Sequence, residues 1–216
     1  MRLFVAVAVP PEVAGELDSA VSPHRAAWPD LRWTGCDAWH LTLAFLGEVT
    51  ETASARLMPR LERAAARYSP LNLSLAGAGA FPGAVRARVL WTGVQGDVSA
   101  LGQLARSVAS GARHAGAPPA DETRPAGSPQ AKKRRRFEPH LTLARCREPM
   151  DIHKLVDDLD EHAGPPWTAR EIYLIRSYLP GTEHGGAGHR DNRRPRYVTL
   201  GSWPLSRPAE APGPGR

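Results

Sequence analysis

The sequence His-Leu-Thr-Leu occurs at residues 40–43 and again, without a change, at residues 140–143. Each copy alternates polar and apolar residues, which predicts a β-strand. Side chains two residues apart on a strand share a face, so His40 and Thr42 lie side by side while the two leucines point into the core. The second copy repeats this arrangement. The repeat therefore predicts two equivalent strands, each presenting one imidazole and one hydroxyl.

The segments around the two copies follow a similar order of strand and helix. Strands are expected at 3–9, 39–46, 71–76, 85–94, 137–144, 170–179 and 196–203, and helices at 11–27, 52–68, 98–115 and 152–162. Pro59 should kink or divide the second of these helices, because proline has no amide hydrogen to donate. The pattern predicts an α+β protein of two pseudo-symmetric lobes. Each lobe is expected to be a small, mostly antiparallel sheet with helices on its outer face. If the two lobes face each other, the two motifs line one groove between them.

One bilobal domain is expected over residues 1–204. Three segments rich in Pro, Gly or Arg show no apolar periodicity, which is typical of loops and disordered chain. These are an insertion at about 118–136, a loop at about 180–194 and a tail at 205–216. The insertion and the loop are expected to be mobile, and the tail is expected to be disordered.

The composition of the 216 residues, with 42% hydrophobic and 23% charged, is typical of a folded globular protein. The net charge of +6 favours anionic partners such as nucleic acid. Five of the 28 basic residues form the run Lys132 to Arg136, and the remaining 23 nearly balance the 22 acidic residues. Cys36 and Cys146 are too few for a disulfide framework and suit the cytoplasm. No stretch approaches the roughly 20 apolar residues of a membrane span.

Two imidazoles and two hydroxyls in one groove suit the opening of a cyclic phosphodiester. One histidine can activate water while the other protonates the departing ribose oxygen, because the imidazole pKa lies near neutral pH. Thr42 and Thr142 can donate to the non-bridging oxygens of the transition state. This chemistry needs no metal. A zinc site would require three or four ligands. The remaining histidines lack ligand spacing: His24, His114, His153, His162, His184 and His189.

Six stretches of the chain match a known family, at residues 2–7, 39–48, 79–82, 89–94, 137–145 and 171–177. Over about residues 2–204 the chain resembles the RNA 2′,3′-cyclic phosphodiesterases of the two-histidine (2H) phosphoesterase superfamily, also called 2′-5′ RNA ligase-like proteins. The resemblance implies a bilobal fold with its active site between the lobes. It also implies hydrolysis of an RNA 2′,3′-cyclic phosphate to a 2′-phosphomonoester.

The resemblance further implies a role for individual residues. His40 is expected to be the proton donor and His140 the proton acceptor, while Thr42 and Thr142 contact the phosphate. Arg145, which follows the second motif, is expected to help hold it. No cofactor is expected. The expected partners are RNA ends or nucleotides with a cyclic phosphate, and the protein is expected to act as a cytoplasmic monomer without a membrane or an obligate protein partner.

Strict alternation along the strand conflicts with one of these roles. It places Arg145 on the leucine face, away from His140, unless the strand ends or bulges just before the arginine. Phe45 has the same parity and is expected in the core, and Trp33 and Trp39 are left undecided.

The same site suits other functions. A 2′-5′ RNA ligase, or a phosphodiesterase for 2′-5′-linked or small cyclic nucleotides, would use the same groups, because hydrolysis and ligation share a transition state. A third alternative is a non-catalytic module that binds RNA ends. Both motifs are intact, which argues against this alternative. The basic run 132–136 ends four residues before His140. It either draws RNA phosphates to the groove or is a solvated charge run without a function.

Overall fold

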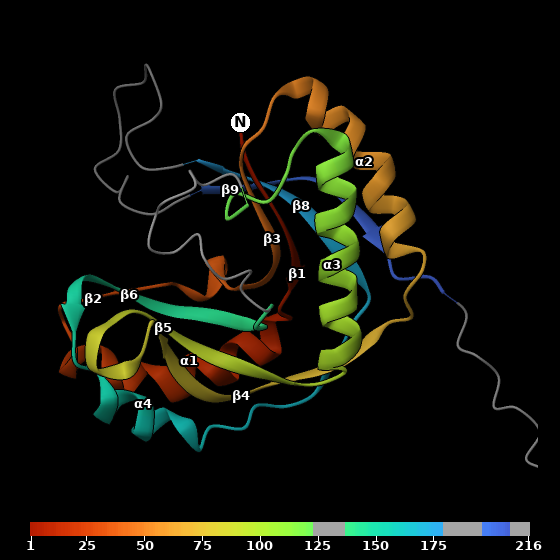
Figure 1. Ribbon diagram of the computed structural model, residues 1–216. Helices are drawn as coiled ribbons and strands as arrows, with labels where there is room; N and C mark the ends of the chain where they lie inside the picture. Colours follow the sequence, from red (N-terminus) through yellow and green to blue (C-terminus); the bar gives the residue numbers. More distant parts are fainter. Residues whose placement is uncertain (123–136, 179–195, 208–216) are drawn as a thin grey trace, which may run out of the picture.

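The computed structural model describes residues 1–122, 137–178 and 196–207, which form two antiparallel sheets and four α-helices (Figure 1). The expected α+β class is confirmed. The elements are β1 (Arg2–Ala8), α1 (Pro11–Ala27), β2 (Leu31–Trp33), the 3₁₀-helix η1 (Cys36–Ala38), β3 (His40–Glu48), α2 (Glu51–Ala65), β4 (Leu71–Phe81), the 3₁₀-helix η2 (Ala84–Arg86), β5 (Ala87–Gly96), α3 (Val98–Ala115), β6 (His140–Met150), α4 (His153–Asp160), β7 (Trp167–Ala169), β8 (Glu171–Tyr178) and β9 (Arg196–Pro204).

The two copies of the motif begin strands in different sheets. Sheet A has the order β3-β1-β8-β9 and contains the first copy, while sheet B has the order β2-β6-β5-β4-β7 and contains the second. The sheets are interleaved in sequence, because the chain passes between them from β1 to β2, from β2 to β3, from β3 to β4 and from β7 to β8. The two lobes are therefore not the two halves of the chain.

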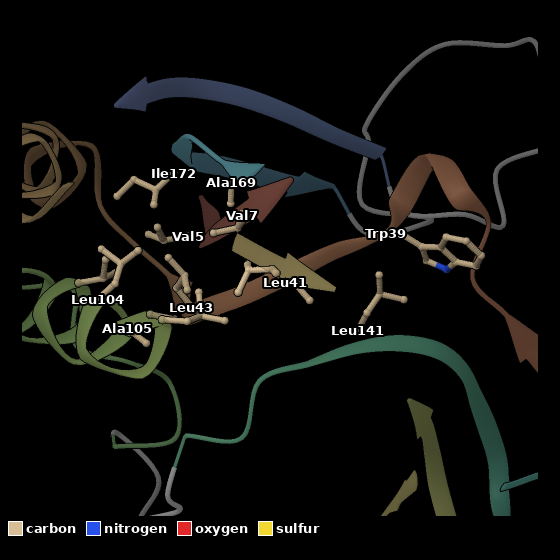
Figure 2. Close-up of a cluster of buried hydrophobic side chains, with 14 of the residues drawn as sticks. Val5, Val7, Trp39, Leu41, Leu43, Leu104, Ala105, Leu141, Ala169 and Ile172 are labelled. Atoms are coloured by element: carbon tan, nitrogen blue, oxygen red, sulfur yellow. The ribbon is translucent and has the colours of Figure 1, made fainter. Parts of the chain in front are cut away.

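A single hydrophobic core joins both sheets to their helices. Helices α2 and α3 pack against each other beside sheet A, and α1 and α4 lie against sheet B (Figure 1). In Figure 2, Leu41 and Leu43 of β3 point toward Leu104 and Ala105 of α3. The helices thus cover the leucine face of β3, and the histidine face is left for the groove.

Several local expectations change. Of the two outcomes expected at Pro59, a kink or a division, the division does not occur, because α2 runs through the proline as one helix. The carbonyl that Pro59 leaves unbonded belongs to the exposed Ala55, where water can reach it. The three-residue edge strands β2 and β7 were not predicted, because so short a segment shows no periodicity.

The described residues include parts of the segments expected to lack structure. The amide of Ala120 donates to the carbonyl of Phe45 at 2.8 Å, and the buried Leu205 donates to the carbonyl of Arg170 at 2.7 Å. The run 132–136, the loop 180–194 and residues 208–216 lie outside the described residues. Among the helices that are described, none is long and apolar enough to cross a membrane.

Candidate active site

A β-bulge follows the histidine and threonine of each motif. The pairing of β3 with β1 skips Leu43, and the pairing of β6 with β5 skips Leu143. In both strands the skipped leucine and the alanine after it are buried, so the alternation of faces shifts by one residue. The next outward residues, Phe45 and Arg145, therefore lie on the same face as the motif histidines.

The bulge determines on which face of their strands Arg145 and Phe45 lie. Arg145 is exposed, and its positive charge is close enough to lower the pKa of both His40 and His140. The core position expected for Phe45 is wrong, because its side chain is 36% exposed and the guanidinium of Arg2 lies 4.7 Å above its ring. The sequence contains a signal for this shift: the leucines of β3 change from a spacing of two, at 41 and 43, to a spacing of three, at 43 and 46.

Of the two undecided tryptophans, Trp39 is buried in the core, which excludes it from the lining of the groove. Trp33 is half-buried at the end of β2, and its indole Nε1 donates to the carbonyl of Trp28 at 3.2 Å. Neither is placed as a platform for a base.

The two histidines are fixed by the same backbone contact. Nδ1 of His40 bonds the carbonyl of Ala38 at 2.8 Å, and Nδ1 of His140 bonds the carbonyl of Glu138 at 2.7 Å. A carbonyl oxygen can only accept, so Nδ1 holds the hydrogen in the neutral ring. Nε2 of each ring remains available to take or give a proton.

Aromatic rings surround His40. The ring of Phe4 stacks on the imidazole, with centroids 4.6 Å apart and an angle of 27° between the planes. The ring of Tyr197 meets the imidazole edge-on at 5.5 Å and also packs on Phe4 at 5.3 Å. These contacts fix the plane of the imidazole and exclude water from one side of it.

A different pair of rings surrounds His140. Phe81 meets the imidazole edge-on at 5.0 Å, and Trp91 lies 6.2 Å away. Trp91 crosses Gly79 of the paired strand so closely that a Cβ at position 79 would lie 2.2 Å from the indole. The sequence analysis gave no role to these rings, nor to Phe4 and Tyr197, although three of the four lie within the stretches that match the family. Their positions depend on strand pairing, which the sequence pattern does not contain.

Burial lowers the pKa of both motif histidines. The pKa of His40 is lowered to about 4, mainly by desolvation and to a smaller degree by the charges of Arg145 and His140, while the hydrogen bond to Ala38 acts in the opposite direction. Desolvation also lowers the pKa of His140, where the hydrogen bond and the charge of Glu138 act in the opposite direction. In the absence of an anion both imidazoles are therefore neutral at pH 7.

The charge of Arg145 also acts on Tyr197, so groups from β3, β6 and β9 lie close together where the two sheets face each other. Thr42 and Thr142 are half-buried on the histidine face, and neither hydroxyl has a hydrogen bond within the described residues. Over the same residues, no three His, Cys, Asp or Glu side chains come together as a metal site. Two proton-transfer groups, two hydroxyl donors and one guanidinium suit an anionic phosphate ester.

Comparison with known proteins gives a consistent result. The sequence model of the 2′-5′ RNA ligase superfamily matches residues 9–179. An RNA 2′,3′-cyclic phosphodiesterase of Archaeoglobus fulgidus is 32% identical over 186 residues, which are 83% of this chain and 92% of the relative. A protein of the same name from Geobacillus stearothermophilus is 30% identical over 208 residues, which are 94% of this chain. The match covers only 56% of that relative, so this chain spans about half its length.

Among solved structures, the apo form of E. coli LigT superposes with a TM-score of 0.69 at 26% sequence identity. The superposition covers 95% of this chain and 98% of LigT. The bilobal architecture expected from the sequence is therefore shared over nearly the whole chain.

Proposed function

Because the chain belongs to the 2′-5′ RNA ligase superfamily, we propose that its groove hydrolyses RNA ends with a 2′,3′-cyclic phosphate to 2′-phosphomonoesters. The observation on which this rests is the placement of two histidines, each with a free Nε2, on strands of two sheets beside one arginine. The activity is also the one for which the two relatives are named.

In the proposed reaction His140 is the proton acceptor and His40 the proton donor. Nε2 of His140 takes a proton from a water whose oxygen forms the new bond to phosphorus. Nε2 of His40 gives a proton to the 3′ oxygen as the P–O3′ bond breaks. Each turnover leaves one proton more on His140 and one fewer on His40, and exchange with solvent restores both. No metal or cofactor enters these steps.

Thr42, Thr142 and Arg145 are proposed to hold the phosphate. The hydroxyls and the guanidinium donate to the two non-bridging oxygens, whose negative charge grows in the transition state. The bound anion also has a second effect. A negative charge between the imidazoles raises both pKa values, so the protonated form of His40 that the reaction needs arises as substrate binds.

The test is product analysis on a defined RNA that ends in a 2′,3′-cyclic phosphate. His40→Ala and His140→Ala should each lower turnover by about 10³-fold, which is within the range for the loss of a general acid or base. His153→Ala is the matched control, because His153 is an exposed histidine on α4 outside the groove. A chelator should leave the rate unchanged.

Each alternative function gives a different product. Full activity in either motif variant would refute the mechanism. A 2′-5′ linkage formed between two RNA ends would indicate ligation by the same groups. Retention of the labelled RNA without a change in it would indicate a module that only binds RNA ends.

We also propose that residues 1–204 act as one domain and as a monomer in the reducing cytosol. The monomer is supported because both motif strands come from one chain. The compartment is supported because Cys36 and Cys146 are both free thiols.

A further inference from the structure

A cavity of about 700 Å³ lies between α2 and α3, away from the active-site groove. Four arginines line it: Arg60 and Arg63 from α2, Arg67 from the turn after α2, and Arg106 from α3. Among the residues that the structure describes, no aspartate or glutamate lines it. Helices α2 and α3 lie beside sheet A (Figure 1), on the leucine face of β3. The histidines occupy the opposite face, so the cleft lined by these helices, the α2–α3 cleft, lies on the side of sheet A away from them.

The two helices hold the cleft in a defined shape. The hydroxyls of Tyr68 and Ser107 are hydrogen-bonded at 2.8 Å. The helices approach closely at Gly111, where an added Cβ would lie 3.4 Å from the Cβ of Arg60. Arg60 and Arg63 stand one turn apart near the C-terminal end of α2, and Arg67 follows in the turn after the helix.

The concentration of charge in the cleft is local. Apart from the run 132–136, basic and acidic residues nearly balance in this chain. Across the ranges that the structure describes, none of the four arginines of the cleft forms an ion pair, whereas Arg25 and Arg113 do. Like charges three or four residues apart destabilise a helix. An anionic ligand would offset this repulsion.

The chemistry of the cleft fits phosphate groups in series. A guanidinium binds a phosphate through two parallel hydrogen bonds, which a lysine cannot do. Several guanidiniums in a row along two helices suit a chain of phosphates better than a single small anion, and the side chains of Gln103 and Ser110 add polar partners. Contacts of this type read the backbone and not the base sequence.

We propose that the α2–α3 cleft binds the phosphate backbone of the RNA at nucleotides away from the cyclic end. The identity of the ligand as RNA rests on the proposed function. The RNA end then lies in the groove on the histidine face of sheet A, and the body of the strand passes around the sheet edge to the arginines. In this arrangement the cleft supplies affinity for long RNA, and the residues on the histidine face carry out the reaction at the cyclic phosphate.

The test measures binding and turnover on different RNAs. Binding is followed by fluorescence anisotropy with a labelled single-stranded 3′-hydroxyl RNA of about 20 nucleotides, over a range of salt concentrations. Turnover is followed on a dinucleotide 2′,3′-cyclic phosphate, which is too short to reach the cleft. The variant is Arg63→Gln/Arg67→Gln/Arg106→Gln, in which all three positions are exposed, so the fold is retained.

A control variant removes the same charge elsewhere. Arg88→Gln/Lys154→Gln/Arg170→Gln changes three exposed positions that do not line the cleft. The cleft variant should bind the long RNA about tenfold more weakly at low salt, and the slope of log Kd against log salt should fall by about 2. Turnover of the dinucleotide should stay unchanged. The control should alter the slope much less.

Equal losses in both variants, or no loss in the cleft variant, would overturn the proposal. Either result is independent of the active site, because the binding RNA has no cyclic phosphate. Conversely, a wild-type protein without turnover on the dinucleotide would refute the proposed function and leave the binding result valid. Arg63→Lys/Arg67→Lys/Arg106→Lys should retain most of the salt slope and only part of the affinity, because the charge is kept without the paired hydrogen bonds.

Discussion

The strands β3 and β6 present the same motif on the same bulged backbone, yet the surroundings of the two histidines differ. Both rings bond a carbonyl two residues earlier through Nδ1. After the bulge β3 presents a phenylalanine, Phe45, and β6 presents a guanidinium, Arg145. The shared backbone gives the proposed site two imidazoles, each with an available Nε2. The difference gives it a direction, with the ring of Phe45 under the guanidinium of Arg2 on the side of β3 and the guanidinium of Arg145 on the side of β6.

The largest effect is expected when the roles of the histidines are separated. If the 3′ oxygen of the cyclic phosphate is replaced by sulfur, the leaving group departs without a proton. His40→Ala should then recover most of the loss of about 10³-fold that it shows on the oxygen substrate, while His140→Ala should stay defective on both. Rates on the two substrates are the measurement. If His140→Ala recovered activity on the sulfur substrate instead, the roles of proton donor and proton acceptor would have to be reversed.

An intermediate effect is expected at the positions where the two strands differ. Arg145→Gln should lower kcat/KM by about 10²-fold through the loss of a charged donor to the phosphate. Phe45→Ala should lower it by less than about tenfold. Because the charge of Arg145 lowers the pKa of both histidines, its removal raises them, and the acidic limb of the kcat/KM profile should move to higher pH. A limb that moves in Phe45→Ala and not in Arg145→Gln would contradict the assigned direction of the groove.

A smaller effect is expected on stability. The pKa of His40 is about 4 in the folded chain and 6.5 in the reference state, so the unfolded chain binds more protons between these values. Above pH 6.5 the neutral ring of His40 makes its full contribution to the free energy of unfolding. This contribution is lost as the pH falls to about 4, at a cost of about 3 kcal/mol in the free energy of unfolding.

The measurement is urea unfolding of the wild type, His40→Gln and His140→Gln at pH 7 and pH 4.5. The His40 variant should show a smaller difference between the two pH values than the wild type. His140→Gln should reduce the difference less, because the charge of Glu138 partly offsets the burial of His140. Equal pH dependence in all three proteins would mean that neither ring is held neutral by burial.

Much of this site is local in sequence, and that part could be predicted. A repeated tetrapeptide on a strand places His40 beside Thr42 whatever the rest of the fold does. The error at Phe45 arose because strict alternation was assumed across a bulge, although the spacing from Leu43 to Leu46 indicates the shift. The aromatic neighbours were not predictable in this way. Phe4, for example, reaches His40 only through the register of β1 on β3, which depends on tertiary structure.

The interleaving of the two sheets has a mechanical consequence. Strands β1, β3, β8 and β9 of sheet A come from both ends of the chain, so no single cut releases a lobe that could fold alone. A protein that opens by a hinge rotates its lobes around one or two connecting segments. Here several chain crossings and a common core join the two lobes. The groove is therefore expected to admit substrate as a rigid, permanently open slot. Splitting the chain within any loop should yield fragments that regain the site only when both are present.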